Sequence, residues 1–229
     1  MSVDAISAED QIAASPPTQP AAARAGAIVL ARHGEPNLSR KIKLSAAGYA
    51  AWWARYEAVG LLPGQTAPAG LVAFGRQAAV ILSSTRPRAI ETAKAVAGDR
   101  AFLIEPQLVE APLPPPRWPD WFRLSPRLWG VTSRTFWWFF NHHDGQESRK
   151  AAQARADAAA DRLALLAAEG DVLVVAHGFF NTMVGRSLRR HGWKLKASQG
   201  YKYWAMRRFE RGGPATPAGP ELAAAVLES

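Results

Sequence analysis

Two histidines follow two apolar runs that lie far apart in the chain. The first run opens the stretch "IVLARHGEPN", residues 28–37, and leads into His33; the second, in "VLVVAHGFF", residues 172–180, leads into His177. Glycine follows each histidine, and a glycine such as Gly178 lets backbone amides approach an anion closely. The pattern predicts two buried strands that deliver two imidazoles to one site.

Three further polar groups follow the same pattern. Arg32 precedes the first histidine, Arg88 follows a second apolar run, and Glu110 follows a third. A neutral imidazole attacks phosphorus when its other nitrogen is held by a backbone carbonyl. Guanidinium groups neutralise the phosphoryl oxygens two at a time, and a carboxylic acid can protonate the leaving oxygen. The set therefore predicts phosphoryl transfer through a phosphohistidine, with no metal and no cofactor.

A zinc site made of the two histidines and Glu110 is the competing interpretation. The two arginines argue against it, because they would repel a divalent cation that the phosphate chemistry does not need. His142, His143 and Asp144 also resemble metal ligands, but neighbouring loop side chains rarely converge on one ion. We interpret these two histidines as solvent-exposed loop residues.

Strand-like and helix-like segments alternate along the chain. The predicted strands cover residues 27–31, 78–84, 101–106 and 171–178, with a late edge strand at 201–210; the predicted helices cover 45–58, 87–98, 145–170 and the stretch that ends at Arg190. This alternation predicts an α/β fold: a three-layer α/β/α sandwich with a mostly parallel central sheet and right-handed crossovers. Ligands of such sheets bind beyond the carboxyl ends of the strands, where both histidines fall.

The segments "LARHGEPN", "SSTRPRAIETA", "LVEAP" and "VVAHG" resemble, in order and spacing, the histidine phosphatase superfamily, also called the phosphoglycerate mutase-like family. "GQES" at 145–148 and "LSAAGYAA" at 44–51 are similar to two further family motifs. The resemblance covers residues 27–209. It implies that His33 is the phosphorylated nucleophile, that Arg32, Arg88 and His177 bind the phosphate together with Asn37, and that Glu110 is the proton donor.

The sequence departs from the mutase pattern around the acid. Mutases have Glu-Arg-x-Tyr-Gly there, whereas Glu110 is followed by "APLPPPRWPDWF", so Glu105 and Asp120 stay open as alternative acids. We expect a metal-independent phosphatase of a small phosphomonoester. The alternatives are a non-catalytic phosphate-binding protein on the same fold and a phosphomutase.

Composition narrows the classes of partner. The net charge of +9 indicates attraction to polyanions or phosphorylated ligands, and the absence of cysteine excludes disulfides and thiolate chemistry. The first ten residues carry acids and lack the apolar core of a secretory signal, so we expect a cytoplasmic protein. The basic stretch 186–196 is interpreted as a solvated helix end, with phosphate steering as the functional alternative. No oligomeric state is predicted.

We divide the chain into an N-terminal disordered arm, 1–25, a histidine phosphatase-like domain, 26–211, and a flexible tail, 212–229, whose last residues could form a short helix. The domain carries a Pro- and Trp-rich insertion at 112–143. Its aromatic and arginine side chains fit a lid that selects the substrate, a satellite core under a long loop, or a contact with a membrane interface. No nucleic-acid-binding module is recognised.

Overall fold

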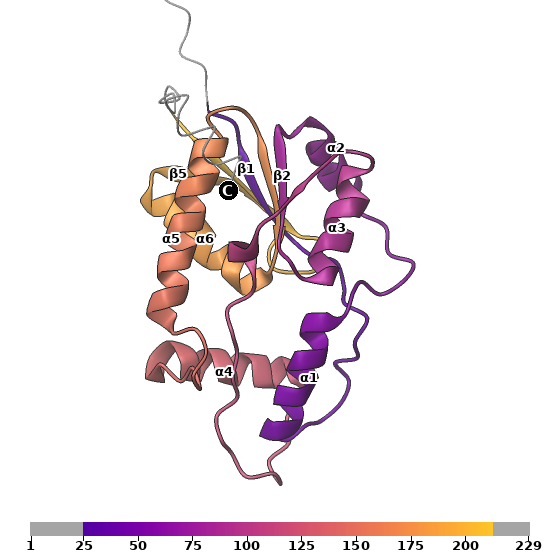
Figure 1. The fold of residues 1–229 in the computed structure, drawn as a ribbon, viewed down its shortest axis with the longest axis vertical. Helices are drawn as coiled ribbons and strands as arrows, with labels where there is room; N and C mark the ends of the chain where they lie inside the picture. Colours follow the sequence, from indigo (N-terminus) through magenta and orange to yellow (C-terminus); the bar gives the residue numbers. More distant parts are fainter. Residues whose placement is uncertain (1–24, 213–229) are drawn as a thin grey trace, which may run out of the picture.

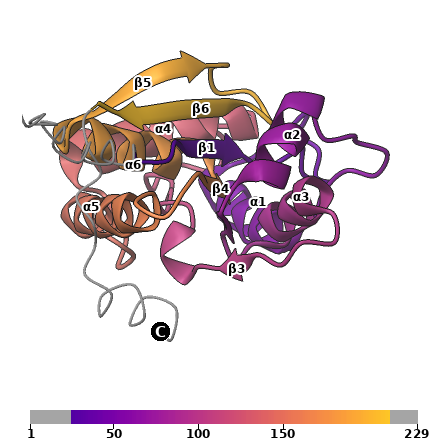
Figure 2. The same ribbon diagram turned by 90° about the horizontal axis from the view of Figure 1, so that it is seen from above.

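The computed structural model describes residues 25–212, and these form a six-stranded sheet with helices on both faces (Figures 1 and 2). The strand order is β3-β2-β4-β1-β6-β5. The bounds are β1 Ile28–Arg32, β2 Val80–Ser83, β3 Leu103–Ile104, β4 Val172–Ala176, β5 Trp193–Ser198 and β6 Met206–Arg211. Strands β1 to β4 run parallel, while β6 is antiparallel to both β1 and β5. The mostly parallel sheet is confirmed.

The helices are α1 Ala46–Ala58, α2 Ala69–Gln77, α3 Pro87–Ala97, α4 Pro126–Phe140, α5 Arg149–Leu166 and α6 Gly178–Arg190, with a 3₁₀ turn at Pro106–Leu108. Helices α5 and α6 cover one face of the sheet and α2 and α3 the other (Figure 2). Alternate strand residues serve the two cores: Val172 and Val174 face α5 and α6, whereas Leu173 and Val175 face α2 and α3. The three-layer prediction is therefore confirmed.

Local sequence explains where the predicted helices begin. The Ser45 and Ser148 side chains accept hydrogen bonds from the amides of Gly48 and Ala151, so each caps the helix that follows it. Pro87 occupies the first turn of α3, where its missing N–H costs nothing. Gly98 ends the same helix at a φ of 61°, a conformation that favours glycine.

Several sequence expectations need correction. Residues 193–198 form the edge strand β5 rather than the end of a helix, because they pair with β6. Strand β6 is interior, since β1 pairs with its other side. The strand predicted at 101–106 is reduced to the two residues of β3. Helices α2 and α4 were not predicted. The predicted arm and tail, including the short helix at the end of the tail, lie outside the described residues except for 25 and 212.

Helix α4 gives the insertion its own core. Trp129 is fully buried and stacks on Tyr49 of α1 at 5.8 Å between ring centroids, and Trp52 and Tyr56 complete the cluster. The Trp129 indole also donates to the carbonyl of Leu44 at 2.7 Å. The N-terminal half of α4 thus packs as a satellite core against α1, whereas Trp137 in its C-terminal half belongs to the core between the sheet and helices α5 and α6. Within residues 25–212, no helix is long and apolar enough to cross a bilayer.

We expect Trp129→Ala to lower the free energy of unfolding by about 3–5 kcal/mol, because it removes a large buried side chain and leaves a cavity. Urea unfolding would measure the change. Trp121→Ala is the matched control, since Trp121 is 79 % exposed on the same insertion and should change stability by about 0.5 kcal/mol or less. Equal losses in the two variants would contradict the satellite core.

Candidate active site

Strand pairing brings the two histidines together. Strands β1 and β4 are adjacent and parallel, with Arg32 opposite Ala176, so the next residue of each strand leaves the sheet at the same edge. The His33 amide extends the ladder by donating to the Ala176 carbonyl at 3.0 Å. The imidazoles of His33 and His177 lie 5.2 Å apart between ring centroids, and both are buried. The predicted juxtaposition is present.

The His33 ring is fixed in one orientation. Its Nδ1 lies 2.6 Å from the Gly34 carbonyl oxygen, which can only accept, so Nδ1 carries the proton and Nε2 keeps its lone pair. Burial, and next the charge of Arg88, hold the pKa of His33 well below its usual range. His33 is therefore a neutral imidazole at neutral pH, the state that a nucleophile requires.

Gly34 serves packing rather than anion binding. Its amide donates to Thr92 Oγ1 at 2.9 Å, and a Cβ there would come within 2.5 Å of the Trp204 ring. The sequence expectation that the glycines admit an anion does not hold at this position. Gly178, at the start of α6, lies beside Arg32. A Cβ added at Gly178 would lie 3.3 Å from the Arg32 guanidinium.

Arg88 connects the two histidines and is itself fully buried. Its Nε donates to His33 Nε2 at 3.3 Å, and one terminal nitrogen lies 3.4 Å from His177 Nδ1. The other terminal nitrogen donates to the Tyr56 carbonyl at 2.6 Å, and Glu57 balances the charge at 2.8 Å. Helix α1 therefore anchors the cation that lies between the imidazoles.

The second histidine is also neutral. Arginine can only donate, so His177 Nδ1 accepts from Arg88 and its Nε2–H donates to Ser84 Oγ at 2.8 Å. Burial, and next the charge of Arg88, hold the pKa of His177 well below its usual range. Ser84 follows β2 directly, yet its role could not be seen in the sequence because its partner is 93 residues away.

Glu110 is the acid that faces the histidines. Its carboxylate accepts from the Phe180 amide at 2.8 Å and the Phe179 amide at 3.2 Å, at the N-terminus of α6. The alternatives lie elsewhere: Glu105 caps the 3₁₀ turn and pairs with Arg162, and Asp120 is on the exposed loop before α4. Of the three acids, Glu110 alone lines the cavity described next.

A cavity of about 270 Å³ opens above the histidines between α1 and α4. Its floor is formed by the predicted residues Arg32, His33, Arg88, Glu110 and His177. Its walls are formed by Arg40, Tyr49, Trp52, Trp53, Tyr56, Leu113, Pro126, Arg127, Gly130, Val131 and Arg134. Five guanidinium groups and one carboxylate line this space, so it attracts an anion. Asn37 is exposed and is not among the lining residues.

Two of the three lining arginines that the sequence did not single out lie against aromatic rings that are distant in the chain. The Arg40 guanidinium lies 5.1 Å from the centroid of the Tyr56 ring, and that of Arg134 lies 4.6 Å from the Phe179 ring. Arg32 likewise lies 4.4 Å from the Tyr203 ring. Arginine is common on protein surfaces, so residue type alone gave no signal for Arg40 in its loop or for Arg127 and Arg134 on α4.

Among the described residues, no group of three His, Cys, Asp or Glu side chains is placed to hold a metal ion. His142 does not approach such a group; its ring nitrogen contacts the Pro115 carbonyl at 3.1 Å. Asp144 instead pairs with Arg117 at 2.9 Å.

The buried histidines should make stability pH-dependent. His33 and His177 take up a proton more readily in the unfolded chain than in the folded protein. Stability is therefore lost as the pH falls below about 6.5, the pKa of a histidine in the unfolded chain. Urea unfolding between pH 7.5 and 5 should show this loss, with a slope of up to about 1.4 kcal/mol per pH unit for each histidine. The His33→Gln, His177→Gln double variant should have a shallower slope, and the exposed-site variant His191→Ala an unchanged one. Identical slopes in all three proteins would contradict two buried neutral imidazoles.

A comparison with protein families identifies the family of this chain. The family model of the histidine phosphatase superfamily (branch 1) matches residues 65–203, which include Arg88, Glu110 and His177; Arg32 and His33 precede the matched segment. No curated protein matches the sequence.

Solved structures share the fold. A mycobacterial hydrolase, "Mycobacterial hydrolase 1", is 21 % identical with a TM-score of 0.53, covering 85 % of this chain and 93 % of its own. The phosphoserine phosphatase of Entamoeba histolytica, solved as a mutant with phosphoserine, is 15 % identical with a TM-score of 0.50, covering 80 % and 89 %. A second structure of this enzyme, in complex with 3-phosphoglyceric acid, is 17 % identical with a TM-score of 0.50, again covering 80 % of this chain and 89 % of its own. The chain belongs to the histidine phosphatase superfamily, branch 1.

Proposed function

We propose that the protein is a metal-independent phosphatase that hydrolyses a small phosphomonoester through a covalent phosphohistidine on His33. One observation carries the proposal: His33 Nε2 keeps its lone pair at the floor of a cationic cavity, because Nδ1 is tied to the Gly34 carbonyl and burial beside Arg88 keeps the ring neutral. A neutral nucleophile beside fixed cations suits attack on an anionic phosphate.

In the first step His33 Nε2 attacks phosphorus and the bond from phosphorus to the substrate's alcohol oxygen breaks. Arg32 and Arg88 donate to the phosphoryl oxygens, whose charge must be stabilised during transfer. His177 Nδ1 lies at the same floor, and a bound phosphate dianion would favour its protonation and add a further donor. Before substrate arrives, Arg88 donates to the acceptor nitrogens of both imidazoles, so these hydrogen bonds must pass to the phosphoryl oxygens before His33 Nε2 attacks and His177 Nδ1 takes up a proton.

Glu110 supplies and recovers the proton. In its acid form it protonates the departing alcohol oxygen; as a carboxylate it then takes a proton from the water that attacks phospho-His33 and releases inorganic phosphate. The carboxylate, at the floor of the cavity, is held by the Phe179 and Phe180 amides of α6, so its position is fixed for both steps.

The size of the cavity supports a small substrate. A volume of about 270 Å³ lies at the lower end of the range for ligand pockets, and helices α1 and α4 form its walls. The phosphoserine bound to the structurally similar Entamoeba histolytica enzyme is a small phosphomonoester.

We expect His33→Ala to abolish turnover of p-nitrophenyl phosphate and to prevent trapping of a phosphorylated enzyme after rapid acid quench. A chelator should leave wild-type turnover intact, because the fixed arginines neutralise the phosphate. His191→Ala is the matched control, since this histidine lies on the surface and pairs with Asp161. Turnover retained in His33→Ala would overturn the proposed nucleophile.

Glu110→Gln should impair an alkyl phosphate more than p-nitrophenyl phosphate, because the nitrophenolate departs with little help from an acid. The loss for the alkyl substrate should be about 10²- to 10⁴-fold in the rate of phosphoenzyme formation. Glu105→Gln is the control, since that acid lies outside the cavity. If both substrates lost the same factor, Glu110 would be a positioning residue rather than the proton donor.

A further inference from the structure

The outer face of α4 exposes several large apolar side chains beside the exposed Thr135, where a surface helix is ordinarily polar. Leu128, Val131 and Phe139 are 54, 61 and 74 % exposed, and their spacing puts them on one side of the helix. Phe140, next to Phe139 at the end of the helix, is 70 % exposed. We call these four side chains the α4 surface. The opposite side of the helix is already used, because Trp129 and Trp137 are buried there.

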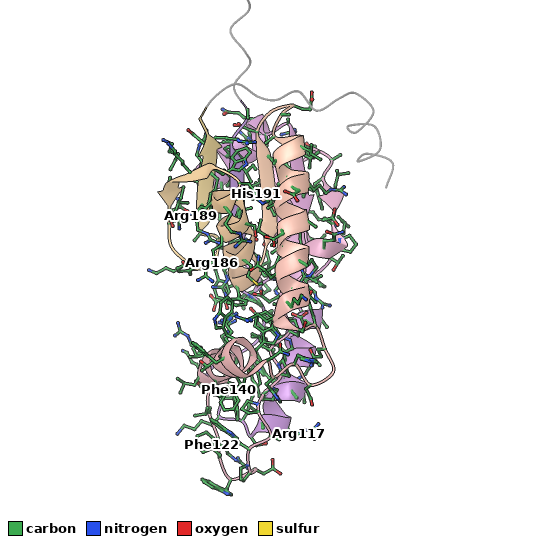
Figure 3. All side chains as sticks on the ribbon, turned by 90° about the vertical axis from the view of Figure 1, so that its left-hand side faces the viewer. Arg117, Phe122, Phe140, Arg186, Arg189 and His191 are labelled. Atoms are coloured by element: carbon green, nitrogen blue, oxygen red, sulfur yellow. The ribbon has the colours of Figure 1, made fainter. Side chains whose placement is uncertain are left out.

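Cations surround the α4 surface. Arg123 and Arg127 are exposed at its N-terminal end. Near its C-terminal end the guanidiniums of Arg149 and Arg186 lie 5.2 and 5.6 Å from the ring centroid of Trp138. Figure 3 shows the side of the molecule on which Phe140 and the α6 arginines Arg186 and Arg189 lie.

Three acids near this side are paired with arginines, and the insertion adds one more acid, the exposed Asp120. Asp144 pairs with Arg117 and Glu147 with Arg155, and Asp157 with Arg190. The insertion, residues 112–143, contains four arginines and one acid, so its net charge is +3. A partner of the α4 surface must therefore present apolar groups to the four exposed side chains and negative charges to the arginines around them.

A second copy of this chain does not meet that requirement, because it carries the same charge of +9. An anionic lipid bilayer does meet it. Exposed Phe, Leu and Val enter the boundary between headgroups and acyl chains, while arginines bind the anionic headgroups.

We propose that the α4 surface docks the protein on anionic lipid bilayers. Arg127 and Val131 also line the cavity, so docking brings the mouth of the candidate active site next to the bilayer. The proposal concerns the outer face of α4 and does not rest on the catalytic roles assigned to the histidines.

Co-sedimentation of the full chain with vesicles tests the proposal. The vesicles are phosphatidylcholine alone, or phosphatidylcholine mixed with phosphatidylglycerol. The protein should bind the mixed vesicles and lose most of that binding at high salt. The Leu128→Ser, Phe139→Ser double variant should bind the mixed vesicles at least roughly tenfold more weakly than the wild type, because both side chains leave the contact. Its turnover of p-nitrophenyl phosphate should equal that of the wild type.

The matched control is the Ile104→Ser, Leu195→Ser double variant, which removes exposed apolar side chains from strands β3 and β5. It should bind the mixed vesicles like the wild type. Three results would overturn the proposal: no binding to mixed vesicles, equal binding to neutral vesicles, or unchanged binding of the double variant. A dimer that light scattering detects in the wild type and not in the double variant, without vesicle binding, would instead assign the α4 surface to self-association.

Discussion

The site depends on one buried charge, the guanidinium of Arg88. A fully buried cation is tolerated only when it is paired and hydrogen-bonded, and Glu57 and the Tyr56 carbonyl supply both from the end of α1. Removing the Glu57 carboxylate would leave an uncompensated charge in the interior, and losing the Tyr56 carbonyl would leave an unsatisfied N–H donor. Helix α1 is therefore held against α3 by the same contact that fixes the cation between His33 and His177.

This arrangement also sets the protonation of the site. The two imidazoles are acceptors toward the same guanidinium, so each must carry its proton on the other nitrogen, where the Gly34 carbonyl and Ser84 Oγ lie. Charge and burial act in the same direction and keep both rings neutral. A site with neutral histidines and several arginines has an excess of positive charge that a phosphate dianion offsets.

The insertion has two sides with different surroundings. Its inner side contributes Trp129 to the satellite core and Gly130 and Arg134 to the cavity wall, so packing in a satellite core and lining the cavity occur on the same helix. Its outer side leaves Leu128 and Phe139 in solvent, and the contact with a membrane interface, which the sequence raised as an alternative, becomes the proposal for that side. The helical period puts the two sets of residues on opposite sides of α4. Composition alone therefore could not predict which aromatic and aliphatic residues are buried and which are exposed.

The sequence by itself determined the α/β alternation, the caps at Ser45 and Ser148, and the placing of His33 and His177 at the ends of parallel strands, because these follow from local period, capping chemistry and the common edge of parallel strands. Only the tertiary structure decided which partners complete the site. Glu57 and Ser84 reach Arg88 and His177 across 31 and 93 residues, and such contacts leave no local pattern. Tertiary contact likewise puts Glu110, and neither Glu105 nor Asp120, on the cavity, where its carboxylate accepts from an amide at the N-terminus of α6. Strand β5 was missed for the same reason: pairing with β6, rather than its own sequence, makes it a strand.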